Sequence, residues 1–316
     1  MAATQEFQSL TLSDLFRLYG VDFGIGSNIE VTGWVRTCRD QKKDVFIALS
    51  DGSSQNTVQI IVSSDMFADL TPFAKLTTGS SISVKGTLVK SPAKEQDFEL
   101  FAKYITIYQK CHPDYPLQKA GLPLDFLRQI PHLRQRSNLF RAIASTKSEV
   151  YHAIHEFFRA RSYIYVDLPV ITKNACESGC QPLQVTSLIN DNRTGSLPAK
   201  MIDGQTSDKI DYSKDFFNTA TYLTVSNQLH LESQQHGLGY VYTITPASRG
   251  EPSQSSKHLA HFNMLEWEAL FKNLDENIDI AEGCIKMVIK HCLTNCKAEM
   301  LVFDKFAQKM QLIGDS

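Results

Sequence analysis

The 316-residue chain lacks several features that define special classes of protein. It has no apolar run of about 18 residues or more, so no membrane-spanning helix is expected. Its start, MAATQEFQSLTLSDLF, has neither the charged and apolar regions of a secretory signal nor the arginines of a transit peptide. We therefore expect a cytoplasmic protein, and a mitochondrial location stays open. The net charge of −2 is small, so any contact with nucleic acid must come from local patches.

The seven cysteines do not have the number or spacing of a disulfide framework, and they form no CxxC pair. Reduced thiols in the cytosol are the simple interpretation. Cys292 and Cys296 lie four residues apart on a predicted helix, beside His291. A zinc site is conceivable there, but small apolar residues on a helix explain the pattern better. We predict no metal site.

The first half of the chain has the pattern of a small β-barrel. Hydrophobic residues make up 42% of the chain and charged residues 21%, which is ordinary for a globular protein, and the length is sufficient for two domains. Five short strands with polar turns predict an OB-fold, which binds oligonucleotides across its middle strands. A plain barrel without a nucleic-acid role fits the composition equally well. The expected strands cover residues 29–35, 45–49, 57–62, 81–88 and 98–107.

A connector rich in proline follows the barrel and predicts a hinge over residues 113–134. Residues 139–161 then show a helical period, and Ser137 or Asn138 can cap the start of this helix. Tyr163 to Val166 favours a short strand. Residues 190–214 are polar and without period, which predicts a loop or a partly disordered insertion. A second helix is expected from Leu274 to Cys296.

Two runs that favour β-strands flank a turn rich in glycine, proline and serine near residue 250, which predicts a long antiparallel hairpin. The turn carries Arg249, Glu251, Lys257 and His258. A planar guanidinium, a carboxylate and further cationic groups suit the phosphates and base of a nucleotide. An ordinary solvated hairpin tip explains the same charges equally well from the spacing alone.

Three blocks of the chain, in the right order, resemble the asparaginyl-tRNA synthetases, a family of class II aminoacyl-tRNA synthetases. The text YLTVSNQLHLE with VYTITPASRGEPSQSSKHLAHFNMLE resembles motif 2 of that family. HLRQRSNLFRAIASTKSEVYHAIHEFFRARSYIYVDLPVIT resembles motif 1. VTGWVRTCRDQKKDVFIALSDGSSQNTVQIIV resembles the anticodon-binding barrel. The match extends from about Leu10 to about Met300.

The resemblance implies an α+β protein with an OB-fold barrel at residues 1–112 and the hinge at 113–134. Residues 135–316 would form an incomplete class II synthetase domain, an antiparallel β-sheet flanked by helices. In the family, the motif 1 segment forms the dimer interface, which implies a homodimer through residues 139–169. The implied activity is ATP-dependent attachment of asparagine to tRNA(Asn) through an aminoacyl-adenylate, with Mg²⁺. Aspartate specificity is a close alternative, although the motif 2 text favours asparagine.

The resemblance also assigns roles to residues of the hairpin and the barrel. Arg249 would bind the α-phosphate and the amino acid carboxylate, and Glu251 would bind the adenine amino group or the tRNA end. Lys257 and His258 would face the outer phosphates. In the barrel, a stacking aromatic and two hydrogen-bonding side chains would read anticodon bases, and two arginines would contact the backbone. The remaining assigned residues are Phe262 for stacking adenine, Gln181 and Gln228 for the amino acid, and Phe46, Gln59, Glu99, Arg36 and Arg39 for tRNA.

The chain also departs from the family pattern. Gln181 and Pro182 replace a substrate-binding Glu and its neighbour, and an amide gives an ammonium group a weaker hydrogen bond than a carboxylate does. The SGQ turn of the family corresponds to Ser226-Asn227-Gln228 in this chain. Asparagine tolerates a positive φ better than most residues, which would allow the turn to survive. No GxGxGxER-like motif 3 occurs, so the Mg²⁺ ligands of the family have no counterpart.

We therefore expect impaired catalysis by this chain alone. The alternatives are a truncated paralogue that binds tRNA or a protein partner, and a product without a stable second domain.

Overall fold

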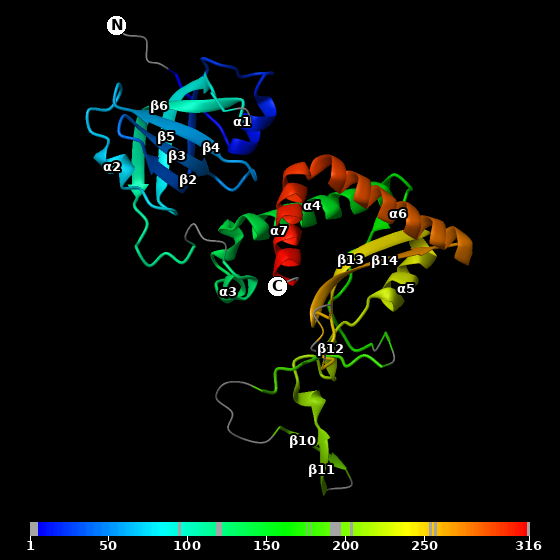
Figure 1. Cartoon of the computed structure of the whole chain (residues 1–316). Coiled ribbons are helices and arrows are strands. Elements are labelled where there is room, and N and C mark those ends of the chain that lie inside the picture. The colour runs from blue at the N-terminus through cyan, green and yellow to red at the C-terminus, as the bar shows by residue number, and fades with distance from the viewer. Residues whose placement is uncertain are drawn as a thin grey trace. The chain divides into compact units, whose positions relative to one another are not determined.

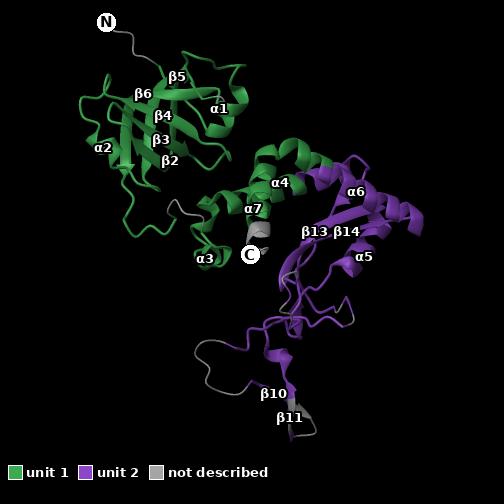
Figure 2. Cartoon of the chain, viewed as in Figure 1, with its two compact units in different colours: residues 1–150, 290–316 green, residues 151–289 purple. Residues whose placement is uncertain are grey.

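The computed structural model describes residues 6–93, 96–117, 122–174, 176–177, 179–189, 197–202, 205–252, 255 and 258–314. The chain forms two compact units (Figure 2), the first from Met1–Val150 with Lys290–Ser316 and the second from Tyr151–Ile289. The predicted boundaries at 112 and 134 stay predictions. No helix among the described residues is long and apolar enough to cross a membrane.

The first unit contains the predicted barrel (Figure 1). Its sheet has the order β1-β2-β3-β4-β6-β5, and pairing of β2 with β5 closes the sheet. A short helix, α1, precedes the barrel, and another, α2, follows β4. All five long strands that alternation predicts are confirmed. The elements are β1 (Gln8–Ser9), α1 (Leu12–Leu18), β2 (Asn28–Asp40), β3 (Asp44–Ser50), β4 (Val58–Ser63), α2 (Thr71–Ala74), β5 (Ser81–Lys90) and β6 (Phe98–Gln109).

Alternation along the strands separates the barrel core from its outer face. In β3, Val45, Ile47 and Leu49 are fully buried, whereas Phe46 is only half-buried. Apolar burial of this kind stabilises a barrel by about 25 cal/mol per Å². Strands β5 and β6 approach each other closely at Gly86, where a Cβ atom would lie 2.3 Å from the carbonyl oxygen of Phe101. Only glycine fits there, because any side chain would overlap the neighbouring backbone.

Several helices follow the barrel, and two of them contain residues of both units. The short α3 (Leu124–Gln129) and η1 (Arg134–Arg136) lead into α4 (Asn138–Arg159), which matches the predicted helix to within two residues at each end. Ser137 caps it weakly, since its Oγ accepts from the amide of Phe140 at 3.4 Å. The second predicted helix is α6 (Leu274–Asn295), and sequence analysis missed the helix that follows it, α7 (Lys297–Gly314).

The described residues give no support to a zinc site at Cys292 and Cys296. His291 contacts Glu149 at 2.7 Å, and Cys292 and Cys296 are buried. Burial raises the pKa of Cys296 to about 11, so this thiol is neutral near pH 7. No group of three or more His, Cys, Asp or Glu among the described residues could hold a metal ion.

The second unit is built on the predicted hairpin, which is confirmed. β13 (Tyr240–Ser248) pairs with β14 (His261–Ala269) in an unbroken antiparallel register, and β7 (Ile164–Tyr165) pairs with β13 in parallel. Phe158 of α4 stacks on Tyr242 with 4.7 Å between ring centroids, and both side chains are fully buried. α5 (Gln228–Leu238) packs on the same two strands. The hairpin is thus held by packing on both of its sides.

A smaller sheet in this unit joins β8 (Ile171–Thr172), β12 (Thr221–Leu223) and β9 (Gln184–Val185). The predicted loop at 190–214 is wrong for its second half. β10 (Ala199–Ile202) and β11 (Gln205–Ile210) form a hairpin, and η2 (Tyr212–Lys214) follows it. Residues 190–196 lie outside the described residues. The Asp203-Gly204 dipeptide between the two strands is a hairpin signal that could have indicated them.

Candidate functional sites

Arg249 stands at the root of the hairpin turn, directly after β13. Its amide donates to the carbonyl of Ala260 at 3.0 Å, which closes the turn. Its Nη2 atom contacts Glu177 Oε2 at 2.7 Å and the carbonyl oxygen of Val225 at 3.4 Å. Because the side chain is only one-quarter exposed, these contacts fix the direction of the guanidinium group. The buried Nε atom has no hydrogen-bond partner among the described residues.

Phe262 lies next to this arginine across the hairpin. It pairs with Ala247 in the register of β13 and β14, and the guanidinium carbon of Arg249 lies 5.5 Å from the centre of its ring. An arginine at this distance from an aromatic ring makes a favourable cation–π contact. The structure therefore brings together the two residues that the resemblance assigns to a phosphate and to a base.

The segment around residues 176–183 packs against the same turn. The amide of Gly250 donates to the carbonyl of Gln181 at 2.7 Å, and a Cβ atom at Gly250 would lie 2.9 Å from Leu183 Cδ2. Gln181 contacts the hairpin through its backbone, and its side chain is exposed. The predicted amino-acid-binding role of the Gln181 side chain stays a prediction.

The turn before α5 is held by a carboxylate of β14. Ser226 Oγ donates to Glu266 Oε1 at 2.5 Å, and the amide of Asn227 donates to Glu266 Oε2 at 3.1 Å. The turn does not use the positive φ that asparagine tolerates, because the φ of Asn227 is −100° and the residue is the N-cap of α5. The turn survives through Glu266 instead. The Asn227 side chain is fully buried, with no partner for its amide atoms among the described residues.

Three carboxylates gather beside the predicted ligand Gln228. Its Nε2 atom donates to Glu232 Oε1 at 3.1 Å. Burial raises the pKa of Glu268, and the nearby charges of Glu232 and Glu266 raise it further. Sequence analysis missed this group, although Glu266 and Glu268 alternate in a strand and therefore share one face. The site thus has a guanidinium and a group of carboxylates, which suits a ligand that carries both charges.

Two further candidate residues of the hairpin turn are described, and both are open to solvent. Glu251 and His258 are exposed, and the backbone amide of His258 donates to Ser255 at 3.3 Å. Lys257 lies outside the described residues. Their predicted contacts with the outer phosphates and the adenine amino group stay predictions, since an exposed side chain is free to adopt several rotamers.

The outer face of the barrel forms a second candidate site. Arg39 Nη2 donates to Gln59 Oε1 at 3.3 Å, and Gln59 Nε2 donates to Glu99 Oε1 at 3.0 Å. Phe46 lies opposite Arg39 in the register of β2 and β3. Four of the five predicted tRNA-binding residues are therefore brought together. Sequence analysis missed Phe101, a half-buried residue paired with Ile61 beside this row.

The positions of Glu99 and Arg36 differ from what their predicted roles suggest, which are contact with an anticodon base for Glu99 and with the tRNA backbone for Arg36. Glu99 is nearly fully buried, and its Oε1 atom accepts hydrogen bonds from Gln59, Ser91 and Gln96. In this structure it therefore orients Gln59. Arg36 turns away from the row and donates to the carbonyl of Arg136 at 2.5 Å.

Comparison with known families covers both parts of the chain. A profile described as tRNA synthetases class II (D, K and N) matches residues 124–313. This chain belongs to the class II tRNA synthetase family. A second profile, described as OB-fold nucleic acid binding domain, matches residues 29–108 of this chain. The predicted α+β fold, an OB-fold barrel followed by a class II synthetase domain, is confirmed.

Curated relatives of this chain are asparagine–tRNA ligases. That of Protochlamydia amoebophila is 42% identical over 282 residues, which cover 89% of this chain and 58% of the relative. That of Acetivibrio thermocellus is 40% identical, with 89% and 59% covered. The chloroplastic/mitochondrial ligase of Arabidopsis thaliana is 37% identical, with 92% and 52% covered. The chain therefore spans little more than half the length of these relatives.

Solved structures give the same fold. Asparaginyl-tRNA synthetase from Pyrococcus horikoshii, complexed with asparaginyl-adenylate, has a TM-score of 0.74 at 23% identity and covers 88% of this chain and 58% of its own. The Entamoeba histolytica enzyme, in complex with asparaginyl-adenylate, has a TM-score of 0.71 at 18% identity, with 92% and 59% covered. At such identities the likeness establishes the fold alone.

Proposed function

We propose that this synthetase takes part in the ATP-dependent attachment of asparagine to tRNA. The observation that carries the proposal is the pairing of Arg249 with Phe262 at the root of the hairpin, where the guanidinium lies 5.5 Å from the ring. The family profile over residues 124–313 and the names of the curated relatives support the same reaction.

In the first step, a carboxylate oxygen of asparagine attacks the α-phosphorus of ATP. A phosphorus–oxygen bond forms to the amino acid, and pyrophosphate leaves with the pair of electrons of the broken bond. Arg249 neutralises the charge that develops on the phosphate, and Phe262 stacks on the adenine. No protein nucleophile is required, because alignment and charge neutralisation supply the rate.

Arg249 must exchange partners during this step. Its Nη2 atom is bonded to Glu177 at 2.7 Å, and a phosphate or carboxylate oxygen would replace that contact. At the other end, the carboxylates of Glu232, Glu266 and Glu268 attract the ammonium group of the amino acid, and Gln228 offers it a side-chain amide oxygen. Opposite charges at the two ends thus orient a zwitterionic substrate.

In the second step, a hydroxyl of the terminal ribose of tRNA attacks the acyl carbon, and AMP leaves. We propose that the barrel holds the anticodon, with Phe46 stacking a base and Gln59 reading a base edge. Glu99 and Arg39 orient Gln59 through the hydrogen bonds that they make to it.

Mg²⁺ accompanies ATP in reactions of this kind. The described residues include no group of three or more His, Cys, Asp or Glu that could hold such an ion. We therefore assign no metal ligand among these residues.

We also propose that the synthetase forms a homodimer through residues 139–169. Ile143, Ile164 and Tyr165 of this segment are each more than 40% exposed, which leaves apolar surface for a partner to cover. The proposed compartment is the cytosol, because the seven cysteines are free thiols.

Asparagine-dependent exchange of pyrophosphate into ATP tests the first step, and Arg249→Met is the informative variant. Loss of a donor aimed at transition-state charge lowers a rate by about 10²–10³-fold. Arg128→Met is the matched control, because Arg128 is an exposed residue paired only with Asp125.

We expect a normal rate from the Arg128 control and a strongly reduced rate from Arg249→Met. Absence of exchange above background by the unaltered chain would reject activation of asparagine by this chain. A rate for Arg249→Met within about threefold of the unaltered chain, a change of under ~1 kcal/mol, would reject the assigned role of the arginine.

A further inference from the structure

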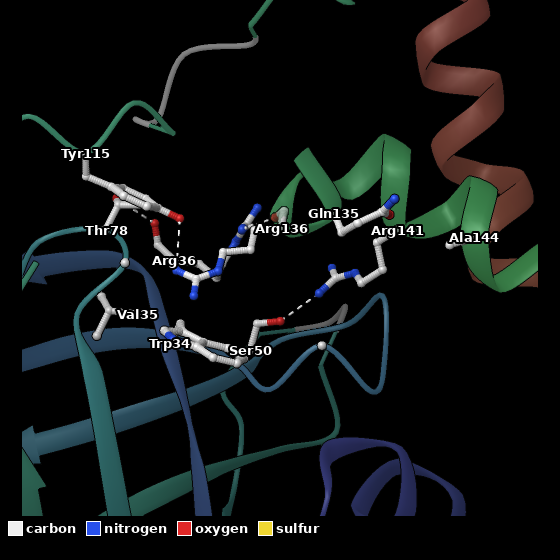
Figure 3. Close-up of a pocket in the computed structure, with 12 residues that line it drawn as sticks. Trp34, Val35, Arg36, Ser50, Thr78, Tyr115, Gln135, Arg136, Arg141 and Ala144 are labelled. Carbon is white, nitrogen blue, oxygen red and sulfur yellow. Dashed lines mark hydrogen bonds between the residues drawn. The ribbon is translucent and has the colours of Figure 1, made fainter. Parts of the chain in front are cut away.

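A pocket of about 400 Å³ lies in the first unit, between the barrel and the segment that leads into α4 (Figure 3). Its apolar walls come from Trp34 and Val35 of β2, from Tyr115 after the barrel, and from Ala144 of α4. Among the predicted site residues that the structure describes, Arg36 alone lines this pocket. Its volume falls within the range of about 300–1,000 Å³ that is typical of small-molecule sites.

Three arginines also line the pocket: Arg36, Arg136 and Arg141. Arg36 donates to the backbone carbonyl of Arg136 and, at 2.9 Å, to Asn138 Oδ1. Arg141 Nη1 donates to Ser50 Oγ at 2.7 Å. These partners are neutral, and no Asp or Glu of the described residues makes a salt bridge with any of the three arginines.

The positive charge of this group is compensated only in part. Burial lowers the pKa of Arg36. Burial lowers the pKa of Arg141 as well, and the charge of Arg36 lowers it further, whereas the charges of Asp51 and Glu299 act in the opposite direction. Desolvated cations that lie near one another raise the free energy of the folded protein. An anion between them would offset that increase through charge-assisted hydrogen bonds.

Arg136 has a different role, because two aromatic rings hold it. Its guanidinium carbon lies 4.8 Å from the centre of the Trp34 ring and 6.0 Å from that of Tyr115. Its Nη1 atom donates to the hydroxyl of Tyr115 at 3.3 Å. The pocket therefore combines cations with flat apolar walls, and an inorganic anion would leave most of the apolar surface without contact.

We propose that this pocket binds a nucleotide unit, with its phosphate against Arg36 and Arg141 and its base against Trp34 and Ala144. Guanidinium groups match the geometry of phosphate oxygens, and aromatic rings are the usual partners of bases. The unit comes either from a free nucleoside monophosphate or from one nucleotide of an RNA strand. The recognised chemistry is the same for both.

Tryptophan fluorescence offers a direct assay, because the chain has only two tryptophans and Trp34 lines the pocket. Trp267→Phe leaves Trp34 as the sole reporter. Full-length protein with this substitution and with Arg249→Met, which disables the predicted hairpin site, is titrated with AMP. We expect a saturable change in Trp34 emission with a dissociation constant of about 1 mM or below, as for a small, weakly enclosed ligand.

Two variants separate binding from a purely structural role of the arginines. Ala144→Phe places a large ring in the pocket, at an exposed residue of α4. The change removes no side-chain hydrogen bond, because the side chain of alanine makes none. Its matched control is Ala68→Phe, the same change at an exposed residue outside the pocket. We expect the first variant to weaken AMP binding at least about tenfold and the second to leave it within about twofold, with urea midpoints near that of the parent.

A comparison of ligands identifies which groups of the nucleotide the pocket recognises. Adenosine should bind at least about tenfold more weakly than AMP, because it lacks the phosphate. A short single-stranded oligoadenylate that binds more tightly than AMP assigns the site to RNA, whereas weaker binding assigns it to free nucleotides. The proposal is overturned if AMP causes no saturable change, if Ala144→Phe binds as well as Ala68→Phe, or if inorganic phosphate binds as tightly as AMP.

Discussion

Substitution of Phe158 by alanine should destabilise the second unit strongly. The ring is fully buried. It stacks on Tyr242 at 4.7 Å with 13° between the ring planes, and it also contacts Tyr163 at 5.1 Å and Trp267 at 5.6 Å between centroids. Three of its neighbours are therefore large, rigid rings that cannot collapse far into the space that the substitution creates.

The size of the effect follows from this packing. Replacing a buried Phe by Ala typically costs about 3–5 kcal/mol. Each aromatic pair contributes about 0.5–1.5 kcal/mol beyond its buried area, which places Phe158 in the upper half of that range. At about 2–4 °C of melting temperature per kcal/mol for a chain of 150–250 residues, a cost of about 4–5 kcal/mol should lower the midpoint by ~8–20 °C.

Urea denaturation followed by tryptophan emission measures the effect. Trp34→Phe leaves Trp267 as a reporter that contacts the substituted ring directly. Phe271→Ala is the matched control, because this Phe is 96% exposed and the same change there should alter the free energy of unfolding by less than about 0.5 kcal/mol. A cost below about 1 kcal/mol for Phe158→Ala, or one equal to that of the control, would refute the assigned packing.

Two further predictions concern charge and recognition. The raised pKa of Glu268 means that the folded state keeps its proton to higher pH than the unfolded state, so stability falls as pH rises from about 4.5 through the folded pKa. Glu268→Gln should therefore be more stable than the unaltered chain at about pH 7, with the difference lost below about pH 4.5; urea midpoints at several pH values test this, and equal midpoints at neutral pH would contradict it. Phe46→Ala should weaken tRNA binding by ~1–3 kcal/mol, measured by filter binding against the same change at the exposed Phe271, and unaltered binding would exclude base stacking.

The strands and the long helix could be predicted because their signals are local. Alternation in β3 and β4 separates Val45, Ile47 and Ile60 in the core from Phe46 and Gln59 outside. A one-residue shift of register would place all of these side chains on the wrong face, so the pattern specifies the strand strongly. The hairpin of β10 and β11 was not predicted, because both strands are short and β11, with the sequence QTSDKI, is largely polar.

The row of residues on the barrel was found only through a family resemblance, and its geometry differs from the expectation. Arg36 and Arg39 are three residues apart in one strand, yet only Arg39 joins Gln59. Arg36 instead contacts the carbonyl of Arg136, 100 residues later in the sequence. Such partners follow from how the chain segments pack together, and no short-range pattern contains them.

The sequence by itself determined the OB-fold barrel, the synthetase hairpin with Arg249 at its turn, and membership of the class II family. These features rest on strand periodicity, turn chemistry and long matching blocks, which are properties of contiguous residues. The tertiary structure decided that Glu177 holds Arg249, that three carboxylates gather beside Gln228, and that three arginines share a pocket with Trp34. The physical reason is that charge and desolvation depend on distances in space, and those distances exist only once the chain has folded.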